Sequence, residues 1–533
     1  MSYKLILFSS FVLASFRVDS QVRELKVNPL KTYQTINHFT ASDAWCGNFV
    51  GQYWEPAQKE QIARWLFSQN LDNTGSPEGI GLSLWRVNLG AGTLEQDSAD
   101  IIPYQRRAES FLAKDGKSYD WKKCAGQQYF MQKASSYGCN NFLLFSNSPP
   151  VQFTKNGRGW SSSKGSANIT SEGYRLFAGY MAEVAKYFIH TKQWNITFIS
   201  PVNEPQVNWT TPKQEGSPWR NSEIKKLLIN LDQALSKSNL NGVKILIPES
   251  SELRWLYEDN PDKKARERFG NDGPYNQVKE FFDSGSANYV GDLKHLDHVI
   301  SGHDYSSHST NKILKATREK VGMEAQKYNL GFYPTEWCML PGLKLPMDGF
   351  TDDWKPDNYA DMQVALLMGR VIYGDMVYAN AAAWGYWKGM EINGDHALIS
   401  LFPKDGNITS GGAIRSNKLL WALGNYSFFI RPGYTRIEVE GSDNLDALVA
   451  SAYTSPDKSR IVVVFVNSAF DTFPVKINFP EIFLNKVQNV SVFRTDTNTD
   501  LGNLHIDNQY TADKEFDIAP RSVTTVVLEL NKD

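Results

Sequence analysis

Short apolar runs recur between residues 36 and 400, and longer segments with helical spacing separate them. Each run is too short for a helix and ends in polar or turn-forming residues, which is typical of buried parallel strands. The segments 171–191 and 221–238 repeat apolar residues every three or four positions and predict amphipathic helices. The eight runs are HFTASDAW (38–45), GLSLWRVNLG (81–90), NFLLFSNSPP (141–150), FISPVNEP (198–205), VKILIPES (243–250), HVISGHDY (298–305), GFYPTEW (331–337) and NAAAWGYW (380–387).

Eight alternations of strand and helix predict an α/β fold, a (β/α)8 TIM barrel over residues 36–420. An open, doubly wound sheet is the alternative. That fold would be expected to carry a glycine-rich phosphate loop, and the segment NLGAGTLEQ (88–96) has only part of such a motif. We therefore expect a loop at 88–96 and a closed barrel around it.

The pattern changes after residue 420. Runs such as RIVVVFVNS and SVTTVVLEL are rich in β-branched residues and are divided by Gly, Asn, Asp and Pro, which predicts a β-sandwich over 421–533. Residues 21–35 are also strand-like, and we expect them to pair with the C-terminal sheet.

The first 20 residues predict a signal peptide. Lys4 precedes an apolar stretch, Leu5 to Phe16, which is too short to span a bilayer and is followed by small and polar residues. The alternative is an ordinary N-terminal strand. With cleavage near Ser20–Gln21 we expect an exported protein (secreted, periplasmic or at the cell surface) without membrane insertion.

Charge and composition exclude some classes of partner. A net charge of −2 and a pI near 6.5 provide no attraction for nucleic acid. The 15 tryptophans fit either a large core or flat platforms for sugars. The four cysteines form no CxxC pair and have no His at ligand spacing, so no zinc site is expected. The spacing leaves two alternatives open. Either Cys124 and Cys139 form a disulfide, or all four cysteines, including Cys46 and Cys338, are buried thiols.

Two carboxylates stand where reactive groups of such a barrel are found, at the carboxyl ends of strands. Glu204 ends the fourth run and Glu336 the seventh, so they can face each other across the barrel mouth. Cleavage of a glycosidic bond needs such a pair. A non-catalytic carbohydrate-binding relative is one rival. A metal hydrolase would depend on His303 and His308, which a strand would point to opposite faces, and no GxSxG motif indicates a serine hydrolase.

Several of these segments resemble glycoside hydrolase family 30, of clan A. They are SPVNEPQVNW, YPTEWCML, SLWRVNLG, FSNSPP, GHDY and LGNYSFFIRPGYTRI, and they span essentially the whole chain after residue 20. Within the family the chain is most similar to bacterial endo-β-1,6-galactanase-like members. The resemblance implies a retaining hydrolase of β-linked poly- or oligosaccharides that needs no cofactor. An exo-acting β-glycosidase, such as a fucosidase, glucosidase or xylan-type enzyme, is the alternative.

The resemblance also implies roles for single residues. Glu204 matches the general acid/base and Glu336 the nucleophile. The predicted substrate contacts are Asn203 at the sugar 2-hydroxyl, Arg86 beside the nucleophile, His303, Tyr305 holding the nucleophile, and Trp384 or Trp387 under the sugar. Beside Arg86 we expect the pKa of Glu336 to be low, and we expect Glu204 to keep its proton near neutral pH.

Further residues near the strand ends are less defined. Asp43 either binds a sugar hydroxyl or caps the next helix, and Trp45 follows it at the end of the first run. Asn147 stands where some family members carry a tryptophan, which makes a glucosylceramidase-like pocket doubtful. Glu249 stands at the end of the fifth run and Glu252 just after it, and substrate contact or surface charge explains them equally well.

Overall fold

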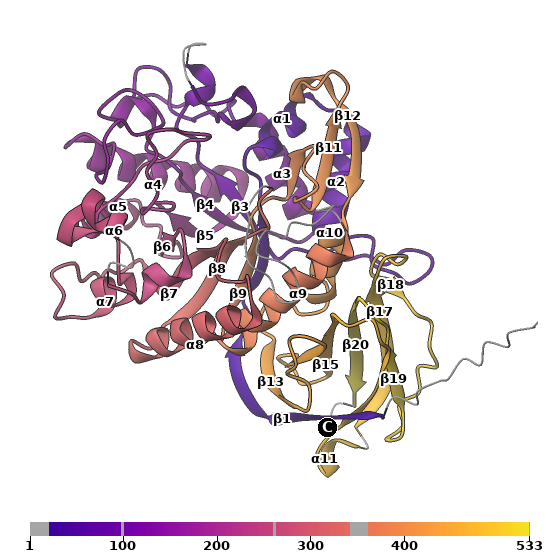
Figure 1. Cartoon of the computed structure of the whole chain (residues 1–533). Helices are drawn as coiled ribbons and strands as arrows, with labels where there is room; N and C mark the ends of the chain where they lie inside the picture. The colour runs from indigo at the N-terminus through magenta and orange to yellow at the C-terminus, as the bar shows by residue number, and fades with distance from the viewer. Residues whose placement is uncertain (1–20, 97–100, 260–262, 342–360, 485, 532–533) are drawn as a thin grey trace, which may run out of the picture.

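The computed structural model describes residues 21–531 except 97–100, 260–262, 342–360 and 485 (Figure 1). The predicted signal peptide, residues 1–20, lies outside the described residues. Among the described helices, none is long and apolar enough to cross a lipid bilayer.

The eight predicted runs form eight parallel strands in the order β8-β7-β6-β5-β4-β3-β2-β9. A parallel bridge between Phe332 and Ala381, and a hydrogen bond from Trp387 N to Trp337 O, join β8 to both ends of β9. The sheet therefore closes, and the predicted TIM barrel is confirmed. Its strands are β2 (His38–Ser42), β3 (Leu84–Asn88), β4 (Asn141–Phe145), β5 (Asn195–Ser200), β6 (Lys244–Ser250), β7 (Leu296–Asp304), β8 (Gly331–Trp337) and β9 (Ala383–Tyr386).

Helices surround the barrel, as Figure 1 shows. Helix α5 buries one apolar stripe, which consists of Ile224, Leu227, Leu228, Leu231 and Leu235, whereas α9 is buried on nearly all sides. The predicted helices at 171–191 and 221–238 correspond to α4 and α5. The helices are α1 (Cys46–Tyr53), α2 (Pro56–Phe67), α3 (Ala125–Ser136), α4 (Gly173–Lys192), α5 (Asn221–Lys237), α6 (Lys263–Phe269), α7 (Gln277–Phe282), α8 (Asn311–Lys327), α9 (Met362–Val377) and α10 (Lys418–Ser427).

A second, nine-stranded sheet carries the C-terminal part of the chain in the order β18-β17-β20-β15-β14-β13-β1-β16-β19. The expectation for residues 21–35 is confirmed, because β1 pairs antiparallel with β13 and parallel with β16. In Figure 1 the indigo β1 lies among the orange and yellow C-terminal strands. The strands are β1 (Arg23–Thr35), β13 (Thr435–Glu440), β14 (Leu448–Thr454), β15 (Arg460–Asn467), β16 (Phe473–Asn478), β17 (Val487–Thr495), β18 (Gly502–Asn503), β19 (Glu515–Ile518) and β20 (Ser522–Leu530).

This sheet folds over itself into a side sandwich. Val475 of β16 and Val490 of β17 come from opposite ends of the strand order and belong to the same hydrophobic core. Its strands alternate between two cores, as period-two geometry requires. In β14, Leu448 faces the sandwich interior, whereas Val449 and Tyr453 belong to the barrel-side core that includes α9 and α10. The sandwich is thus packed directly on the barrel.

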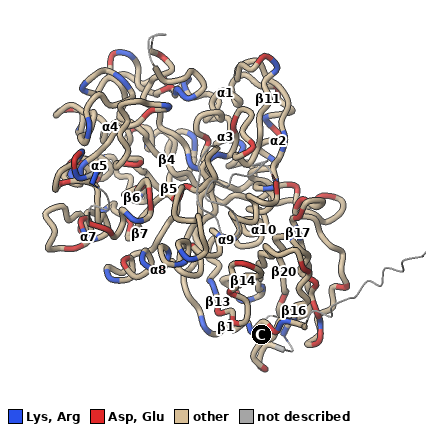
Figure 2. Tube along the Cα trace, in the orientation of Figure 1, with Lys and Arg blue, Asp and Glu red and all other residues tan. Residues whose placement is uncertain are grey.

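A small sheet extends the barrel beyond β9. It consists of β10 (Met390–Ile392), β11 (Ile399–Pro403) and β12 (Gly412–Ser416). The four cysteines are buried free thiols, so the predicted alternative of a Cys124–Cys139 disulfide is wrong. Figure 2 shows Lys and Arg mixed with Asp and Glu over both parts of the molecule, consistent with the small net charge.

Candidate active site

A cavity of about 590 Å³ opens at the carboxyl ends of the barrel strands. Its lining residues come from the segments that follow β3, β5, β6, β7, β8 and β9. They include five of the predicted site residues, namely Asn203, Glu204, Tyr305, Glu336 and Trp387. Because all strands of the barrel end at the same face, the fold brings together groups that lie far apart in sequence.

Glu204 reaches this cavity through an unusual backbone. Strand β5 ends at Ser200, and Pro201 cannot continue its hydrogen bonding. Glu204 adopts a φ of 46°, a left-handed conformation that is costly for a residue with a side chain. Its N–H donates to the carbonyl oxygen of Glu249 over 2.9 Å, which helps to hold this conformation. The Glu204 side chain remains 14% exposed, so it is accessible from the cavity.

Both carboxylate oxygens of Glu336 are bound. The Arg86 guanidinium contacts Oε1, and the Tyr305 hydroxyl donates to Oε2 over 2.7 Å. Burial raises the pKa of Tyr305 well above its ordinary value, so this hydroxyl keeps its proton and acts as a donor. The Arg86 guanidinium also lies 3.6 Å above the centre of the Phe145 ring, which fixes its plane. Glu336 is therefore held rigidly by a group from β3 and by one from the residue directly after β7.

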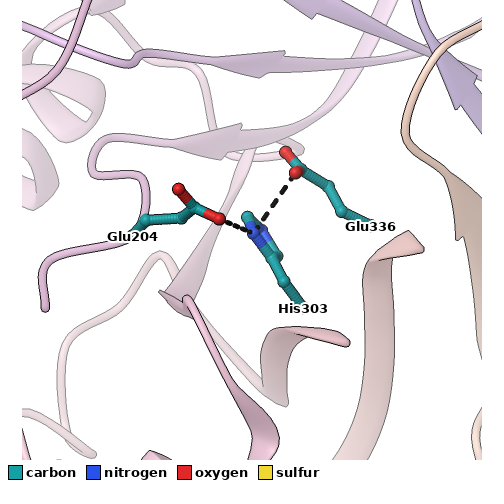
Figure 3. Close-up of side chains that lie close together, drawn as sticks. All are labelled: Glu204, His303 and Glu336. Atoms are coloured by element: carbon teal, nitrogen blue, oxygen red, sulfur yellow. Dashed lines mark hydrogen bonds and ion pairs between the residues drawn. The ribbon is translucent and has the colours of Figure 1, made fainter. Parts of the chain in front are cut away.

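His303 bridges the two carboxylates, as Figure 3 shows. Its Nδ1 lies 3.1 Å from Glu204 Oε1 and 3.2 Å from Glu336 Oε2. One oxygen of Glu204 and one of Glu336 lie within 4.8 Å of each other. The two carboxyl groups predicted to act together thus share a hydrogen-bonding partner.

Glu249, at the end of β6, lies behind this bridge. It is completely buried, and its Oε2 lies 2.9 Å from His303 Nε2 and accepts from the Thr335 hydroxyl. Neither predicted explanation for Glu249, substrate contact or surface charge, is correct. Its position at the end of an apolar run, like that of Glu336, is the sequence signal that could have identified it. Glu252 does line the cavity, where it pairs with Arg254.

The charged groups of this cluster shift one another's pKa values. Although burial opposes its charged form, Glu336, Glu204 and Glu249 raise the pKa of His303 to about 10. Burial likewise opposes charge on Glu249, but Arg86 and His303 lower its pKa to about 2. Burial raises the pKa of Glu336, and Arg86 and His303 only partly offset this. The expectation of a low pKa for Glu336 is therefore wrong, because it left out the loss of hydration.

The geometry can be compared with known proteins. The profile of O-Glycosyl hydrolase family 30 matches residues 22–397. The chain belongs to this family. A family 30 hydrolase cleaves O-glycosidic bonds, so the protein is an O-glycosyl hydrolase.

Three relatives indicate what this family 30 hydrolase is similar to. An endo-beta-1,6-galactanase of Hypocrea rufa is 29% identical over 258 residues, which cover 44% of this chain and 52%, about half, of that protein. The crystal structure of a conserved exported protein from Bacteroides fragilis has 30% identity and a TM-score of 0.84, with 95% of this chain and 100% of the other covered. A xylanase C catalytic domain from Talaromyces cellulolyticus has 18% identity and a TM-score of 0.64, with 95% and 99% covered, and shares the fold.

Asn203 is oriented by Arg86 in this hydrolase. Arg86 Nη2 donates to Asn203 Oδ1 over 3.2 Å. The amide nitrogen of Asn203 is then the donor that remains for a ligand, and Asn203 lines the cavity. This arrangement suits the predicted contact with a sugar hydroxyl.

The structure separates the two tryptophans predicted as sugar platforms. Trp387 lines the cavity, and Trp45 packs edge-on against it with ring centres 5.5 Å apart. Trp384 is fully buried, and its indole N–H donates to Asp375 over 2.9 Å. Trp387 is therefore the platform candidate, Trp45 supports it from behind, and Trp384 lies in the barrel wall.

Asp43 and Asn147 are not among the residues that line the cavity. The Asp43 carboxylate accepts from Asn88 N over 2.9 Å and from Gln127 Nε2 over 2.7 Å, and burial raises its pKa to about 7. It does not cap α1. Asn147 is buried and donates to Asn88 Oδ1 over 3.2 Å. Both side chains contact the protein interior.

Four basic residues that were not predicted also line the cavity, namely Arg106, Lys213, Lys388 and His396. Lys388 contacts the buried Glu391, and Arg106 lies 3.3 Å from the same carboxylate. Burial, reinforced by Arg106, lowers the pKa of Lys388 to about 7. No motif marks these residues in the sequence, because the loops that carry them have no regular pattern.

Glu204, His303 and Glu336 could in principle offer one ligand atom each to a metal ion. However, both ring nitrogens of His303 face carboxylates, and its raised pKa favours the imidazolium. An imidazolium has no lone pair for a metal. The cluster is thus better suited to proton transfer than to metal coordination.

Proposed function

We propose that this family 30 hydrolase cleaves β-linked glycans by double displacement, with Glu204 as general acid/base and Glu336 as nucleophile. The observation that carries this proposal is the pairing of the two carboxyl groups across His303, with Arg86 and Tyr305 fixing Glu336. A nucleophile must be held still, whereas an acid must reach the leaving group. The Glu204 side chain is more exposed than that of Glu336, and this difference supports the division of roles.

In the first step a Glu336 oxygen attacks the anomeric carbon, and the glycosidic C–O bond breaks as Glu204 protonates the leaving oxygen. This yields a covalent glycosyl ester. In the second step Glu204 takes a proton from water, which attacks the same carbon and releases Glu336. Trp387 would lie under the sugar ring, and the Asn203 amide would contact a hydroxyl.

The separation of the two groups supports retention of configuration. Their nearer oxygens lie within 4.8 Å. Retaining enzymes place their carboxyl groups about 5–5.5 Å apart, whereas inverting enzymes need about 6.5–9.5 Å to admit a water molecule. An oxygen–oxygen gap of this size lies nearer to the retaining range, which supports the proposal of double displacement.

For the substrate we propose internal cleavage of β-1,6-galactan. The support is the similarity to the Hypocrea rufa endo-beta-1,6-galactanase, which covers about half of that protein. We also propose export of the protein. The apolar stretch in residues 1–20 and the similarity to an exported Bacteroides fragilis protein support this.

The test is a product profile on β-1,6-galactan, β-1,6-glucan and glucuronoxylan, with aryl β-galactoside, fucoside and glucoside alongside. Proton NMR of the first product reports its anomeric configuration. We expect β-configured galacto-oligosaccharides from galactan and none with Glu336→Gln. Release of single sugars from aryl glycosides alone would replace the endo assignment with an exo-acting enzyme, and an α-configured product would overturn double displacement.

A further inference from the structure

Glu249 is a charged residue for which the two-carboxylate reaction has no role. It is fully buried and is not among the residues that line the cavity, so it does not touch a substrate there. Its φ of 53° places it, like Glu204, in the left-handed region. A buried carboxylate is costly unless it is paired and hydrogen-bonded, so the partners of Glu249 indicate its role.

Besides hydrogen bonds with Thr335 and Ser301, Glu249 makes three contacts that lead to the catalytic pair. Its Oε2 faces His303 Nε2 at 2.9 Å, and its Oε1 lies 3.7 Å from Arg86 Nη2. Its carbonyl oxygen accepts the N–H of Glu204. Glu249 is therefore connected to the acid through the backbone and through His303, and to the nucleophile through Arg86.

The contact between Glu249 and His303 determines the orientation of the imidazole ring. When Nε2–H donates to Glu249, the ring plane is fixed and Nδ1 is directed at Glu204 and Glu336, 3.1 and 3.2 Å away. Without a carboxylate behind it, the ring could rotate or lose a proton. Its two contacts with the catalytic carboxyl groups would then weaken.

Glu249 contributes one of the negative charges that surround the two cations of the cluster. The groups that face one another are Arg86 from β3, Glu204 after β5, Glu249 from β6, His303 from β7, Tyr305 directly after β7, and Glu336 from β8. Glu249 and Glu336 each lie close to both Arg86 and His303. Removal of Glu249 takes one negative charge away from His303, which favours loss of a proton from the ring.

We propose that Glu249 is a positioning residue that holds His303 between Glu204 and Glu336 and so keeps the proton needed for leaving-group departure in the cluster. This inference rests on the proposed two-carboxylate mechanism. Glu249 acts through His303 and does not contact the substrate.

The test compares Glu249→Gln with Glu280→Gln, a matched change to a carboxylate that is not among the residues lining the catalytic cavity and that accepts from Ser286 and Asn288. For a substrate with a poor leaving group we expect kcat of Glu249→Gln to fall about 10- to 100-fold at a similar KM. The basic limb of its pH profile should move down by about one to three units, since an opposite charge close to His303 is lost. A dinitrophenyl glycoside, which needs no protonation, should lose much less activity. Glu280→Gln should leave the pH profile unchanged.

Equal losses with both leaving groups at an unchanged pH profile would show that Glu249 is merely structural and overturn the proposal. Glu249→Asp should recover part of the rate, and circular dichroism checks that each variant is folded. Nitrogen-15 NMR of the histidines follows His303 without turnover, and its pKa should fall in folded Glu249→Gln. An unchanged titration also rejects the proposal. If the wild type cleaved no β-glycoside while the pKa of His303 still fell in Glu249→Gln, the proposed mechanism would be rejected. The role of Glu249 in positioning His303 would stand.

Discussion

The Tyr305 hydroxyl donates a 2.7 Å hydrogen bond to Oε2 of Glu336, while Arg86 binds Oε1 of the same carboxylate. The two oxygens are thus fixed from different strands of the barrel. A carboxylate held at both oxygens cannot rotate freely, which the proposed role as nucleophile requires, and this restraint is a property of the assembled barrel rather than of any single strand.

Tyr305→Phe should lower kcat about 10- to 100-fold, because it removes one hydrogen bond to a charged group while leaving the ring in place. The KM should change little. Steady-state kinetics on an aryl glycoside measure both constants, and Tyr257→Phe, a tyrosine outside the catalytic cavity, is the control. A higher KM at an unchanged kcat would indicate instead that Tyr305 contacts the substrate.

Arg86→Met should move the acidic limb of the kcat/KM profile to higher pH. Burial already raises the pKa of Glu336, and the positive charge of Arg86 opposes this rise. Loss of that charge should therefore raise the pKa further, by about one to three units. Activity would then require higher pH for Glu336 to ionise. Arg86→Lys keeps the charge and should keep the limb near its original position. An identical limb in wild type and Arg86→Met contradicts this coupling.

The two tryptophans of the β9 region should respond differently to substitution. Trp387→Ala removes the aromatic surface that lines the cavity and should reduce kcat/KM by about 10-fold or more, since an aromatic contact of about 0.5–1.5 kcal/mol is lost with the buried area. Trp384→Phe removes the hydrogen bond to Asp375 and should lower the melting temperature with nearly normal kcat/KM. The reverse pattern would make Trp384 the sugar platform.

Chelation should leave the activity intact. The ligand atoms of Glu204, His303 and Glu336 are engaged with one another and with protein cations. We expect equal rates before and after dialysis against EDTA, and no gain on adding Mg²⁺, Ca²⁺ or Zn²⁺. Loss of activity that a single metal restores would refute the proton-transfer assignment.

Arg318→Met should destabilise the barrel next to the site. Arg318 is fully buried between Asp304 and Asp375, so its removal leaves two carboxylates without their cation. The expected loss is about 3–5 kcal/mol of unfolding free energy, measured by denaturant unfolding. Lys315→Met, on the exposed face of α8 where Lys315 and Glu319 lie 3.9 Å apart, should cost less than about 1 kcal/mol. Similar values for both variants would argue against a buried ion triad.

The barrel could be predicted from the sequence because its strands are buried on both faces and appear as continuous apolar runs. Glu204 and Glu336 could be found because barrel strands end at one face. The cysteines could not be assigned, since nothing in their spacing separates a disulfide from buried thiols. Glu249 was seen but misinterpreted, because its depth below the surface depends on neighbouring strands.

The sequence by itself determined the order of the strands and helices, the side sandwich and the two carboxylates, since these follow from local hydrophobic periodicity and from position along a strand. Only the tertiary structure decided that His303 lies between Glu204 and Glu336, that Trp387 rather than Trp384 faces the cavity, and that burial raises the pKa of Glu336. The physical reason is that these properties depend on distances between side chains from different strands and on the water that those side chains exclude. Neither quantity is encoded in any single segment.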